Sequence, residues 1–158
     1  MDAGRLIRTM AWKIALGGVL PRVYDRVRNF FSEPATLGAQ GEKEAERHLL
    51  KQGWVIVDRG FTARGGEIDL VAVDGQTIVF VEVKTRSSDR KGHPSEAVTH
   101  EKQQRLTRAA YSFLAKKQLI NCSFRFDVIS IIWPDRQQAP TIEHCEHAFE
   151  PAGKFQLV

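Results

Sequence analysis

Residues 79–84, with the sequence Val-Phe-Val-Glu-Val-Lys, constrain the fold of this chain more than any other segment. β-Branched and aromatic residues dominate the run, which is typical of a buried strand. Side chains alternate between the two faces of a strand, so Glu82 and Lys84 share a face. The run therefore predicts a sheet strand that carries an acid and a lysine side by side.

A second strand is predicted at residues 66–71, with the sequence Gly-Glu-Ile-Asp-Leu-Val. The dipeptide Asp74-Gly75 separates the two runs and is the strongest short signal for a β-hairpin. A two-residue turn at this dipeptide places Asp69 opposite Phe80 and diagonal to Glu82. A four-residue loop places Asp69 directly opposite Glu82. Either even-length loop keeps both carboxylates on one face, whereas a bulge or an odd-length loop would separate them.

The two faces of this hairpin differ in charge. One face carries no charge and holds Ile68, Leu70, Ala72, Thr77, Val79, Val81 and Val83. The other face is apolar only near the turn, and its far end carries Glu67, Asp69, Glu82, Lys84 and Arg86. Carboxylates beside a lysine can hold a divalent metal ion next to a scissile phosphate. The alternative is a structural ion-pair network, although carboxylates that outnumber nearby cations are costly to bury without a metal.

The chain has 158 residues, enough for one domain with a sizeable core. Hydrophobic residues make up 42% and charged residues 27%, as in soluble globular proteins. No apolar run approaches the length of a membrane span. The two cysteines, Cys122 and Cys145, have no CxxC spacing and are expected to be reduced thiols, although a single bridge stays open as an alternative. These features predict a cytoplasmic protein.

Positive charge is distributed unevenly along the chain. The net charge of +4 comes mostly from residues 1–36, which carry six Lys/Arg and three Asp/Glu, whereas residues 37–150 carry sixteen of each. Within the neutral region, residues 84–117 hold nine Lys/Arg against three Asp/Glu, and a predicted helix there places Lys102, Arg105 and Arg108 near one another. A basic surface beside an acidic corner suits a phosphate backbone, and the alternative is a solvated helix face.

Residues 1–36 are interpreted as a basic, amphipathic N-terminal extension of a domain at 37–150, which a tail at 151–158 follows. Apolar residues in the extension fall at helical spacing, but Lys13 interrupts the apolar stretch that a secretory signal would need. A basic amphipathic helix can lie on anionic lipid. Such a segment more often packs on its own domain or is a poorly ordered terminus, so membrane contact is the weaker interpretation.

The rest of the chain alternates helices and strands. The predicted elements are a helix at about 38–52, a strand at 54–57, a flexible approach at 64–66, the hairpin, a polar loop at 87–93, a helix at about 95–117, a strand at 124–133 and a short strand at 141–149. This order predicts a single α/β domain with a central mixed sheet flanked by helices.

Glu42 lies at the centre of the inward face of the first predicted helix, among Ala45, Leu49 and Leu50. A glutamate on a core-facing stripe needs a reason. One reason is a role in the charged corner of the sheet, and the alternative is a favourable position near the positive end of the helix dipole.

His144, Cys145 and His147 raise the question of a zinc site. Their spacing matches no standard pair of zinc ligands, and in a strand His144 would face away from the other two. We interpret the three as ordinary residues of an edge strand.

Several motifs, taken in order, resemble the YraN-like family of uncharacterised bacterial proteins. They are Gly38-x-x-Gly41-Glu42, Gly66-Glu67-Ile68-Asp69-Leu70, Phe80-Val81-Glu82-Val83-Lys84-x-Arg86, Lys102, and Arg125-Phe126-Asp127-Val128. The resemblance covers about residues 38–150. It implies a restriction-endonuclease-like fold, similar to that of archaeal Holliday-junction resolvases and other nucleases with an Asp…Glu-x-Lys signature.

Carried over to this sequence, the resemblance implies that Asp69 and Glu82 are metal ligands, that Glu42 joins them, and that Lys84 is a catalytic lysine. The metal would be Mg²⁺ or Mn²⁺. The expected activity is phosphodiester hydrolysis, with DNA of branched or structured form as the favoured substrate. Residues expected to contact backbone phosphates are Arg86, Lys102 and Arg105.

The chain departs from the family pattern at one place: Arg59-Gly60 stands where relatives usually have Arg-Asn, so a substrate-contacting or loop-capping side chain is in doubt there. Two other functions compete with catalysis. One is a non-catalytic nucleic-acid-binding protein on the same scaffold, and the other is a membrane-associated adaptor acting through residues 1–31. Cleavage of both strands of a junction would favour a symmetric homodimer.

Overall fold

The predicted hairpin lies inside a larger sheet with the strand order β1-β2-β3-β4-β5. The computed structural model describes residues 36–87, 98–135 and 137–153. Its strands are β1 (Val55–Ala63), β2 (Gly66–Asp74), β3 (Thr77–Arg86), β4 (Phe124–Ile132) and β5 (Thr141–Phe149), and its helices are α3 (Leu37–Lys51) and α4 (His100–Lys116). Strands β3 and β4 run parallel and the other neighbours antiparallel. The predicted α/β domain with a mixed sheet is confirmed, and it is consistent with a restriction-endonuclease-like fold.

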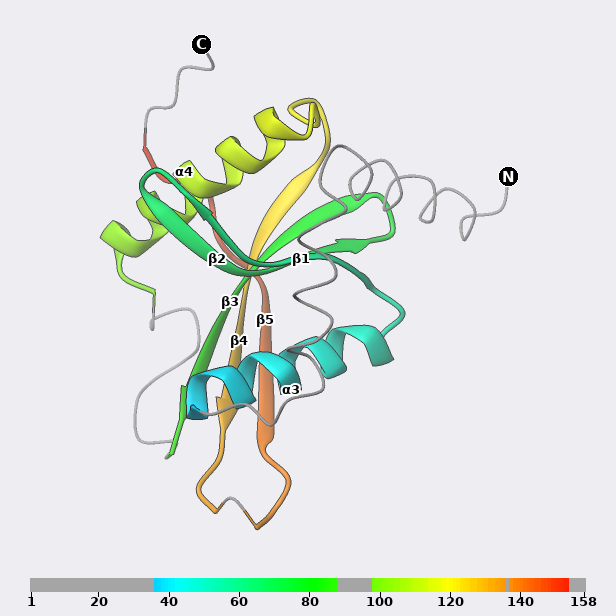
Figure 1. Cartoon of the computed structure of the whole chain (residues 1–158), viewed down its shortest axis with the longest axis vertical. Helices are drawn as coiled ribbons and strands as arrows, with labels where there is room; N and C mark the ends of the chain where they lie inside the picture. Colours follow the sequence, from blue (N-terminus) through cyan, green and yellow to red (C-terminus); the bar gives the residue numbers. More distant parts are fainter. Residues whose placement is uncertain (1–35, 88–97, 136, 154–158) are drawn as a thin grey trace.

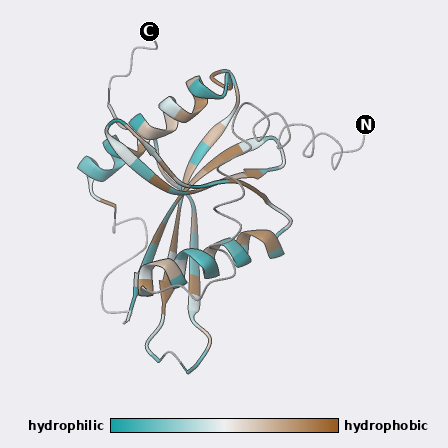
Figure 2. Ribbon diagram, in the orientation of Figure 1, coloured by the Kyte–Doolittle hydropathy of each residue, from teal (hydrophilic) through white to brown (hydrophobic). Residues whose placement is uncertain are grey.

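The two helices cover opposite faces of the sheet. Figure 1 shows α4 along the part of the sheet that contains β1 and β2, and α3 across β3 and β4. Figure 2 shows hydrophilic residues along the outer sides of both helices. Under α4 lies a cluster that includes Phe61, Ile68, Val71, Val73, Ile78, Phe80, Leu106, Phe113, Phe126 and Val128. Under α3 lies a second cluster, of Ala45, Leu49, Trp54, Leu70, Ala72, Val79, Val81, Ile129 and Ile131.

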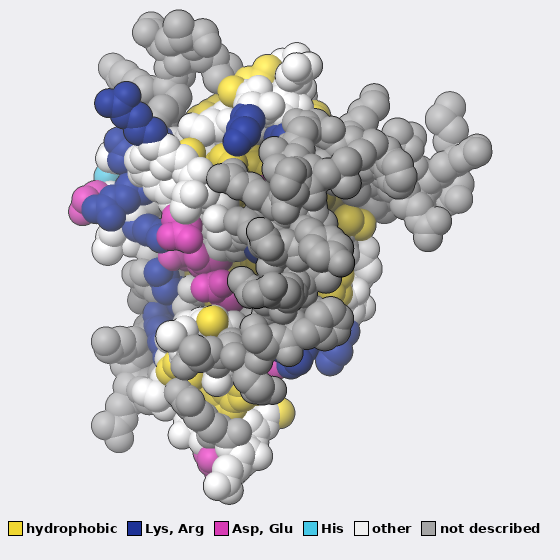
Figure 3. All heavy atoms as spheres, viewed as in Figure 1, with side chains coloured by type: hydrophobic (Ala, Val, Ile, Leu, Met, Phe, Trp, Pro, Cys, Tyr) yellow, Lys and Arg dark blue, Asp and Glu magenta, His cyan; other side chains and the backbone are white. Residues whose placement is uncertain are grey.

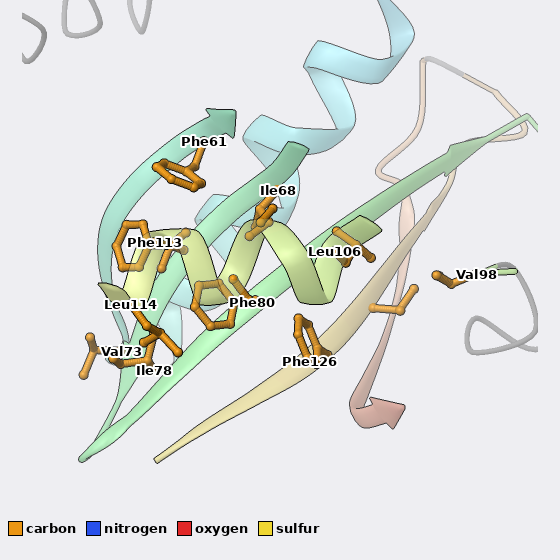
Figure 4. Packing of buried hydrophobic residues seen from close by; sticks show 14 residues of the cluster. Phe61, Ile68, Val73, Ile78, Phe80, Val98, Leu106, Phe113, Leu114 and Phe126 are labelled. Carbon is orange, nitrogen blue, oxygen red and sulfur yellow. The ribbon is translucent and has the colours of Figure 1, made fainter. Parts of the chain in front are cut away.

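Aromatic rings fill the cluster under α4. Phe113 of α4 packs edge-on against Phe61, with ring centroids 5.1 Å apart, and against Phe80, with centroids 5.8 Å apart. Figure 4 shows these rings between the helix and the strands. Because Phe61 belongs to β1 and Phe80 to β3, these ring contacts fix α4 on both strands.

Both helices begin at a threonine cap. The side chain of Thr36 accepts a hydrogen bond from the main-chain N–H of Ala39, and that of Thr99 accepts one from Lys102. Helix α3 ends before Gly53, whose φ of 85° suits glycine, close to the predicted end. The second helix was predicted to begin at about residue 95, and this start is wrong. The helix begins at His100, after the non-helical residues 98 and 99.

The hairpin has a different register from the two-residue turn predicted at Asp74-Gly75. Asp74 pairs with Thr77, so the turn consists of Gly75 and Gln76, and Leu70 pairs with Val81. Continued by one residue, this register would place Asp69 opposite Glu82, as predicted for a four-residue loop, but the pairing of β2 with β3 ends at Leu70 and Val81. Asp69 contacts β3 through its side chain instead, because its Oδ2 accepts a hydrogen bond from the main-chain N–H of Val83.

One residue of the hairpin is on the other side of the sheet from its predicted position. Ile68 was expected beside Leu70 and Ala72, but it packs in the cluster under α4, whereas those two residues pack in the cluster under α3. The strict alternation of faces therefore breaks at Asp69. The pairing of β2 with β3 also stops there, after Leu70 and Val81.

Two further details correct the sequence predictions. Strand β1 continues to Ala63 instead of ending near residue 57, and Ala63 pairs with Gly66, so the expected flexible approach at 64–66 is a tight turn between strands. Residues 1–35 of the predicted N-terminal extension, most of the polar loop and the end of the tail lie outside the described residues. No helix within the described ranges is long and apolar enough to cross a membrane.

Candidate functional site

Glu82 is the centre of the candidate site. It lies on β3, and its residue is only 3% exposed. Its Oε1 accepts a hydrogen bond from Lys84 Nζ at 2.6 Å and also lies 3.1 Å from Lys102 Nζ. Its Oε2 is buried and has no hydrogen-bond partner. One oxygen of the carboxylate is thus paired twice, while the other is buried and has no hydrogen-bond partner.

Asp69 lies beside Glu82 and is tied to the next strand. Its Oδ2 accepts a hydrogen bond from the main-chain N–H of Val83 at 2.7 Å. Burial raises the pKa of Asp69 to about 7, and the negative charges of Glu82 and Glu42 act in the same direction. The Val83 hydrogen bond and the charge of Lys102 oppose this rise. Asp69 therefore faces more negative than positive charge.

Glu42 approaches the same place from α3. The residue is exposed, yet neighbouring atoms crowd its carboxyl group, and this desolvation raises its pKa, followed by the charges of Glu67 and Glu82. The charges of Glu67 and Glu82 reach Glu42, so Glu42 lies near the strand carboxylates. The prediction that Glu42 and Leu50 lie on the inward face of the helix is wrong, because both residues are exposed.

A close approach of α3 to β3 brings Glu42 to this position. A Cβ added to Gly41 would lie 1.8 Å from Thr85 Oγ1, so only glycine allows the helix to pack this tightly. Thr85 follows Lys84 directly on β3. The residue before Glu42 therefore contacts the residue after Lys84.

Glu67 is an acidic residue of this corner that was not assigned to the site from sequence. It lies near enough to Glu42 that its charge raises the pKa of that carboxyl group. The available signal was its position two residues before Asp69, on the face already recognised as charged.

The predicted phosphate-contacting residues divide between two environments. Lys102 reaches into the site and pairs with Glu82. Arg105 pairs with Glu101 on the exposed side of α4. Arg86 ends β3 two residues beyond Lys84, and its main-chain oxygen accepts a hydrogen bond from Trp133. Lys102 thus contacts a carboxylate of the site directly.

Acidic and basic side chains lie next to one another on this side of the molecule. Figure 3 shows a patch of acidic side chains flanked by a row of basic side chains between α4 and α3. A surface of this kind attracts a phosphate backbone to the basic residues and can place one phosphate over the acids when a cation bridges them.

The acids fit a divalent cation in one specific respect. Across residues 36–87, 98–135 and 137–153, no three His, Cys, Asp or Glu side chains are arranged to hold a metal ion by themselves. However, Glu82 Oε2 is a buried oxygen without a partner, and burial, followed by the charge of Glu82, raises the pKa of the neighbouring Asp69. Mg²⁺ commonly takes one or two carboxylates and keeps several waters, which is the donor set available here.

A second buried carboxylate, Asp127 of β4, has a different environment. It is completely buried, and it accepts hydrogen bonds from Arg125, from His144 Nε2 at 3.0 Å and from the main-chain N–H of His147 at 3.1 Å. Burial alone would raise its pKa, but these bonds hold the pKa below its ordinary value. His144 of the predicted edge strand is therefore a partner of Asp127, and this fully paired network has a structural role.

Arg59 and Gly60 explain the departure from the family pattern. Arg59 of β1 makes a two-pronged hydrogen bond to Glu46 of α3, one turn after Glu42, and so helps to hold that helix. Gly60 has a φ of 55°, in the left-handed region that glycine and asparagine adopt most readily. The replacement of the asparagine by glycine is therefore compatible with the backbone at this point.

Comparison with known proteins places these residues in a family context. The family model described as uncharacterised protein family UPF0102 matches residues 41–131. A UPF0102 protein of Rhodopirellula baltica is 40% identical over 155 residues, covering 96% of this chain and 93% of the relative. A UPF0102 protein of Geobacter metallireducens is 50% identical over 117 residues, covering 74% of this chain and 94% of the relative.

The two relatives differ in how much of this chain they match. The match to the Rhodopirellula baltica protein includes most of residues 1–36, because it leaves only 4% of the chain unmatched. The site residues from Glu42 to Lys102 all fall within the range of the family model. With the motifs, the site and these matches in agreement, the chain belongs to the uncharacterised protein family UPF0102, the YraN-like family that its motifs resemble.

Proposed function

We propose that this protein is a metal-dependent nuclease that hydrolyses phosphodiester bonds. The observation that carries the proposal is the state of Glu82, a buried carboxylate with two lysines on one oxygen and no partner on the other. A structural ion pair would be expected to satisfy both oxygens, as the network around Asp127 does. An unsatisfied oxygen beside Asp69 indicates a place for a cation.

Asp69 and Glu82 would hold the metal ion, with Glu42 as a further ligand from α3. Bound Mg²⁺ or Mn²⁺ would supply Lewis acidity and neutralise charge on the phosphate. Lys84 supplies the positive charge that does not depend on the metal. Its side chain is 31% exposed, so the ammonium group can reach a phosphate oxygen or the attacking water at the site entrance.

The proposed substrate is nucleic acid, specifically branched or structured DNA. Arg86 and Arg105 would contact backbone phosphates on either side of the acidic corner, because they lie beyond it on β3 and α4. A symmetric dimer would suit cleavage of both strands of a junction.

A second function is supported by one observation. Two lysines already neutralise Glu82 without a metal, and the described residues contain no ready-made group of three metal ligands. A nucleic-acid-binding protein that keeps the nuclease scaffold without catalysis would show the same arrangement. Measurement of cleavage and binding in the same preparations separates the two functions.

The decisive experiment compares wild type with Lys84→Ala and with Lys116→Ala, a matched control that removes an exposed lysine from the last turn of α4. Each protein is incubated with Mg²⁺ or Mn²⁺ and with branched, duplex and single-stranded DNA and RNA. We expect Lys84→Ala to lower the cleavage rate at least about 100-fold with nearly unchanged binding, since the lysine acts where charge develops during the reaction.

The same series includes controls for metal dependence and for a contaminating nuclease. Wild type and Lys116→Ala should lose cleavage when EDTA is added and should cleave at equal rates without it. Equal cleavage by wild type and Lys84→Ala would indicate a contaminant or another active site. Firm binding without cleavage by wild type on any substrate would favour the non-catalytic function.

A further inference from the structure

The two lysines on Glu82 come from different parts of the fold. Lys84 lies on β3, two residues from Glu82, and Lys102 lies in the first turn of α4. Their side chains are 31% and 32% exposed, and both ammonium groups contact the same oxygen, Oε1. A carboxylate as buried as Glu82 needs one cation, yet this one has two.

A single lysine could not both stay paired with Glu82 and move to a substrate phosphate. Removing the only partner of a buried charge is strongly destabilising, because the charge is then left uncompensated in a poorly hydrated place. If Lys84 alone paired with Glu82, any movement of Lys84 toward a substrate phosphate would carry that penalty. The presence of Lys102 removes the conflict.

We propose that Lys102 is a positioning residue that keeps Glu82 paired and thereby allows Lys84 to leave Glu82 and contact the nucleic-acid phosphate. The role of Lys84 in this inference rests on the proposed nuclease function, whereas the shared pairing of Glu82 does not. Lys102 is thus assigned to the interior of the site, and not to the phosphate-contacting face of α4 on which its spacing from Arg105 places it by sequence.

The surroundings of Lys102 suit a partner that stays in place. Its main-chain N–H donates to the Thr99 cap, which fixes the first turn of the helix. One turn later, α4 packs so closely on β2 that a Cβ added to Gly66 would lie 2.4 Å from the main-chain oxygen of Arg105. The charge of Lys102 also acts on Asp69, so a single side chain offsets two carboxylates.

A stability cycle tests the pairing without any nuclease activity. Lys84→Met, Lys102→Met and the double variant are melted in metal-free buffer, and the same set is prepared in a Glu82→Gln background. The Tm of each single variant should fall little, because the other lysine still pairs with Glu82. The Tm of the double variant should fall by at least about 3 °C more than the sum of the two single decreases. In the Glu82→Gln background this excess should disappear.

The matched control for this cycle is Lys116→Met, which makes the same substitution on the same helix away from the site. A double variant that fails to fold, but folds in the Glu82→Gln background, supports the shared pairing as strongly as a measured excess does. The shared pairing would be overturned if the Tm loss of the double variant equalled the sum of the single losses both with Glu82 and in the Glu82→Gln background. Lys102 would then contribute nothing through Glu82.

The kinetic part of the test separates positioning from phosphate binding. Lys102→Met should lower kcat about tenfold and leave KM within about twofold, and Lys102→Arg should recover most of the loss because it restores a cation beside Glu82. A rise in KM with unchanged kcat would overturn the positioning role and make Lys102 a phosphate contact. If wild type cleaves nothing, the nuclease proposal fails, and the stability cycle still decides whether Lys102 and Lys84 share Glu82.

Discussion

Asp69 Oδ2 and the main-chain N–H of Val83 form a hydrogen bond of 2.7 Å, and this bond stands where strand pairing between β2 and β3 stops. The carboxylate thus takes the place of a main-chain acceptor. This contact directs the Asp69 side chain toward β3 and Glu82. It also coincides with the break in alternation that turns Ile68 toward α4.

The raised pKa of Asp69 predicts a specific pH dependence of stability. The ordinary pKa is 3.8 and the folded value is about 7, so the folded state holds this proton more tightly than the unfolded state. The contribution of this proton to the free energy of unfolding is complete below about pH 4. It falls as pH rises toward 7 and stays low above pH 7. Because one pKa unit corresponds to about 1.4 kcal/mol, the full change is at most about 4 kcal/mol, reduced by the water that reaches the site.

Asp69→Asn tests this dependence, because the amide oxygen can still accept from Val83 while the charge is removed. In metal-free denaturation experiments, the variant should gain stability relative to wild type as pH rises from 4 to 7, and the gain should level off above pH 7. Glu143→Gln, an exposed acid on β5, is the control and should show no such trend. A constant difference between Asp69→Asn and wild type over this range would contradict the raised pKa.

Gly41→Ala should displace α3 from β3, since the new Cβ would lie 1.8 Å from Thr85 Oγ1. We expect a loss of about 1–3 kcal/mol in the free energy of unfolding, as for other overpacked sites. Gly38→Ala is the matched control in the same helix, because the atom nearest to its added Cβ lies at 4.0 Å. That control should be neutral or stabilising by up to about 1 kcal/mol, from the helix propensity of alanine.

A second substitution shows whether the clash with Thr85 is the cause. Thr85→Gly in the Gly41→Ala background removes both the hydroxyl and the Cβ that the new methyl group meets. The stability loss of the combined variant should then be smaller than the sum of the two separate losses. Additive losses would mean that Gly41 matters for a reason other than its contact with Thr85.

Local sequence patterns predicted the strands, the grouping of acids and the general fold, and each miss has a physical reason. The Asp74-Gly75 dipeptide marks a hairpin reliably, but it does not decide which two residues lie in the turn. Here Gly75, with a φ of 58°, takes the first turn position, and Asp74 belongs to the strand. This shift of one position in the turn moves the register of β2 against β3 by two residues.

The positions of Ile68 and Lys102 depend on contacts that are distant in sequence. Alternation placed Ile68 beside Leu70, but it could not show that Asp69 would bond to Val83 and break the pattern. Helical spacing placed Lys102 beside Arg105, but the direction of each side chain follows from how α4 packs on β2. In both cases the tertiary contact overrides a correct local rule.

Asp127→Asn should be strongly destabilising, because Arg125 and His144 would lose the carboxylate that they share. The expected loss is about 3–5 kcal/mol, the usual range when one partner of a buried ion pair is removed. The lowered pKa of Asp127 means that its contribution is present above the ordinary pKa of 3.8 and is lost as pH falls through the lower folded value. Denaturation at pH 7 measures the loss, and a value near that of Glu143→Gln would show that the network contributes little.

Metal binding should stabilise the folded protein through the same carboxylates that repel one another without it. A cation that binds only the folded state raises its stability by about 2.7 kcal/mol at a concentration 100 times the dissociation constant, which is a rise of about 5–10 °C in Tm for a domain of this size. We expect this rise for wild type in Mn²⁺, and a much smaller one for Asp69→Asn and Glu82→Gln. Glu143→Gln should respond as wild type does, because its acid lies away from the site. An equal rise in all four proteins would mean that Mn²⁺ binds elsewhere, and calorimetric titration of the same set would show whether any site remains at Asp69 and Glu82.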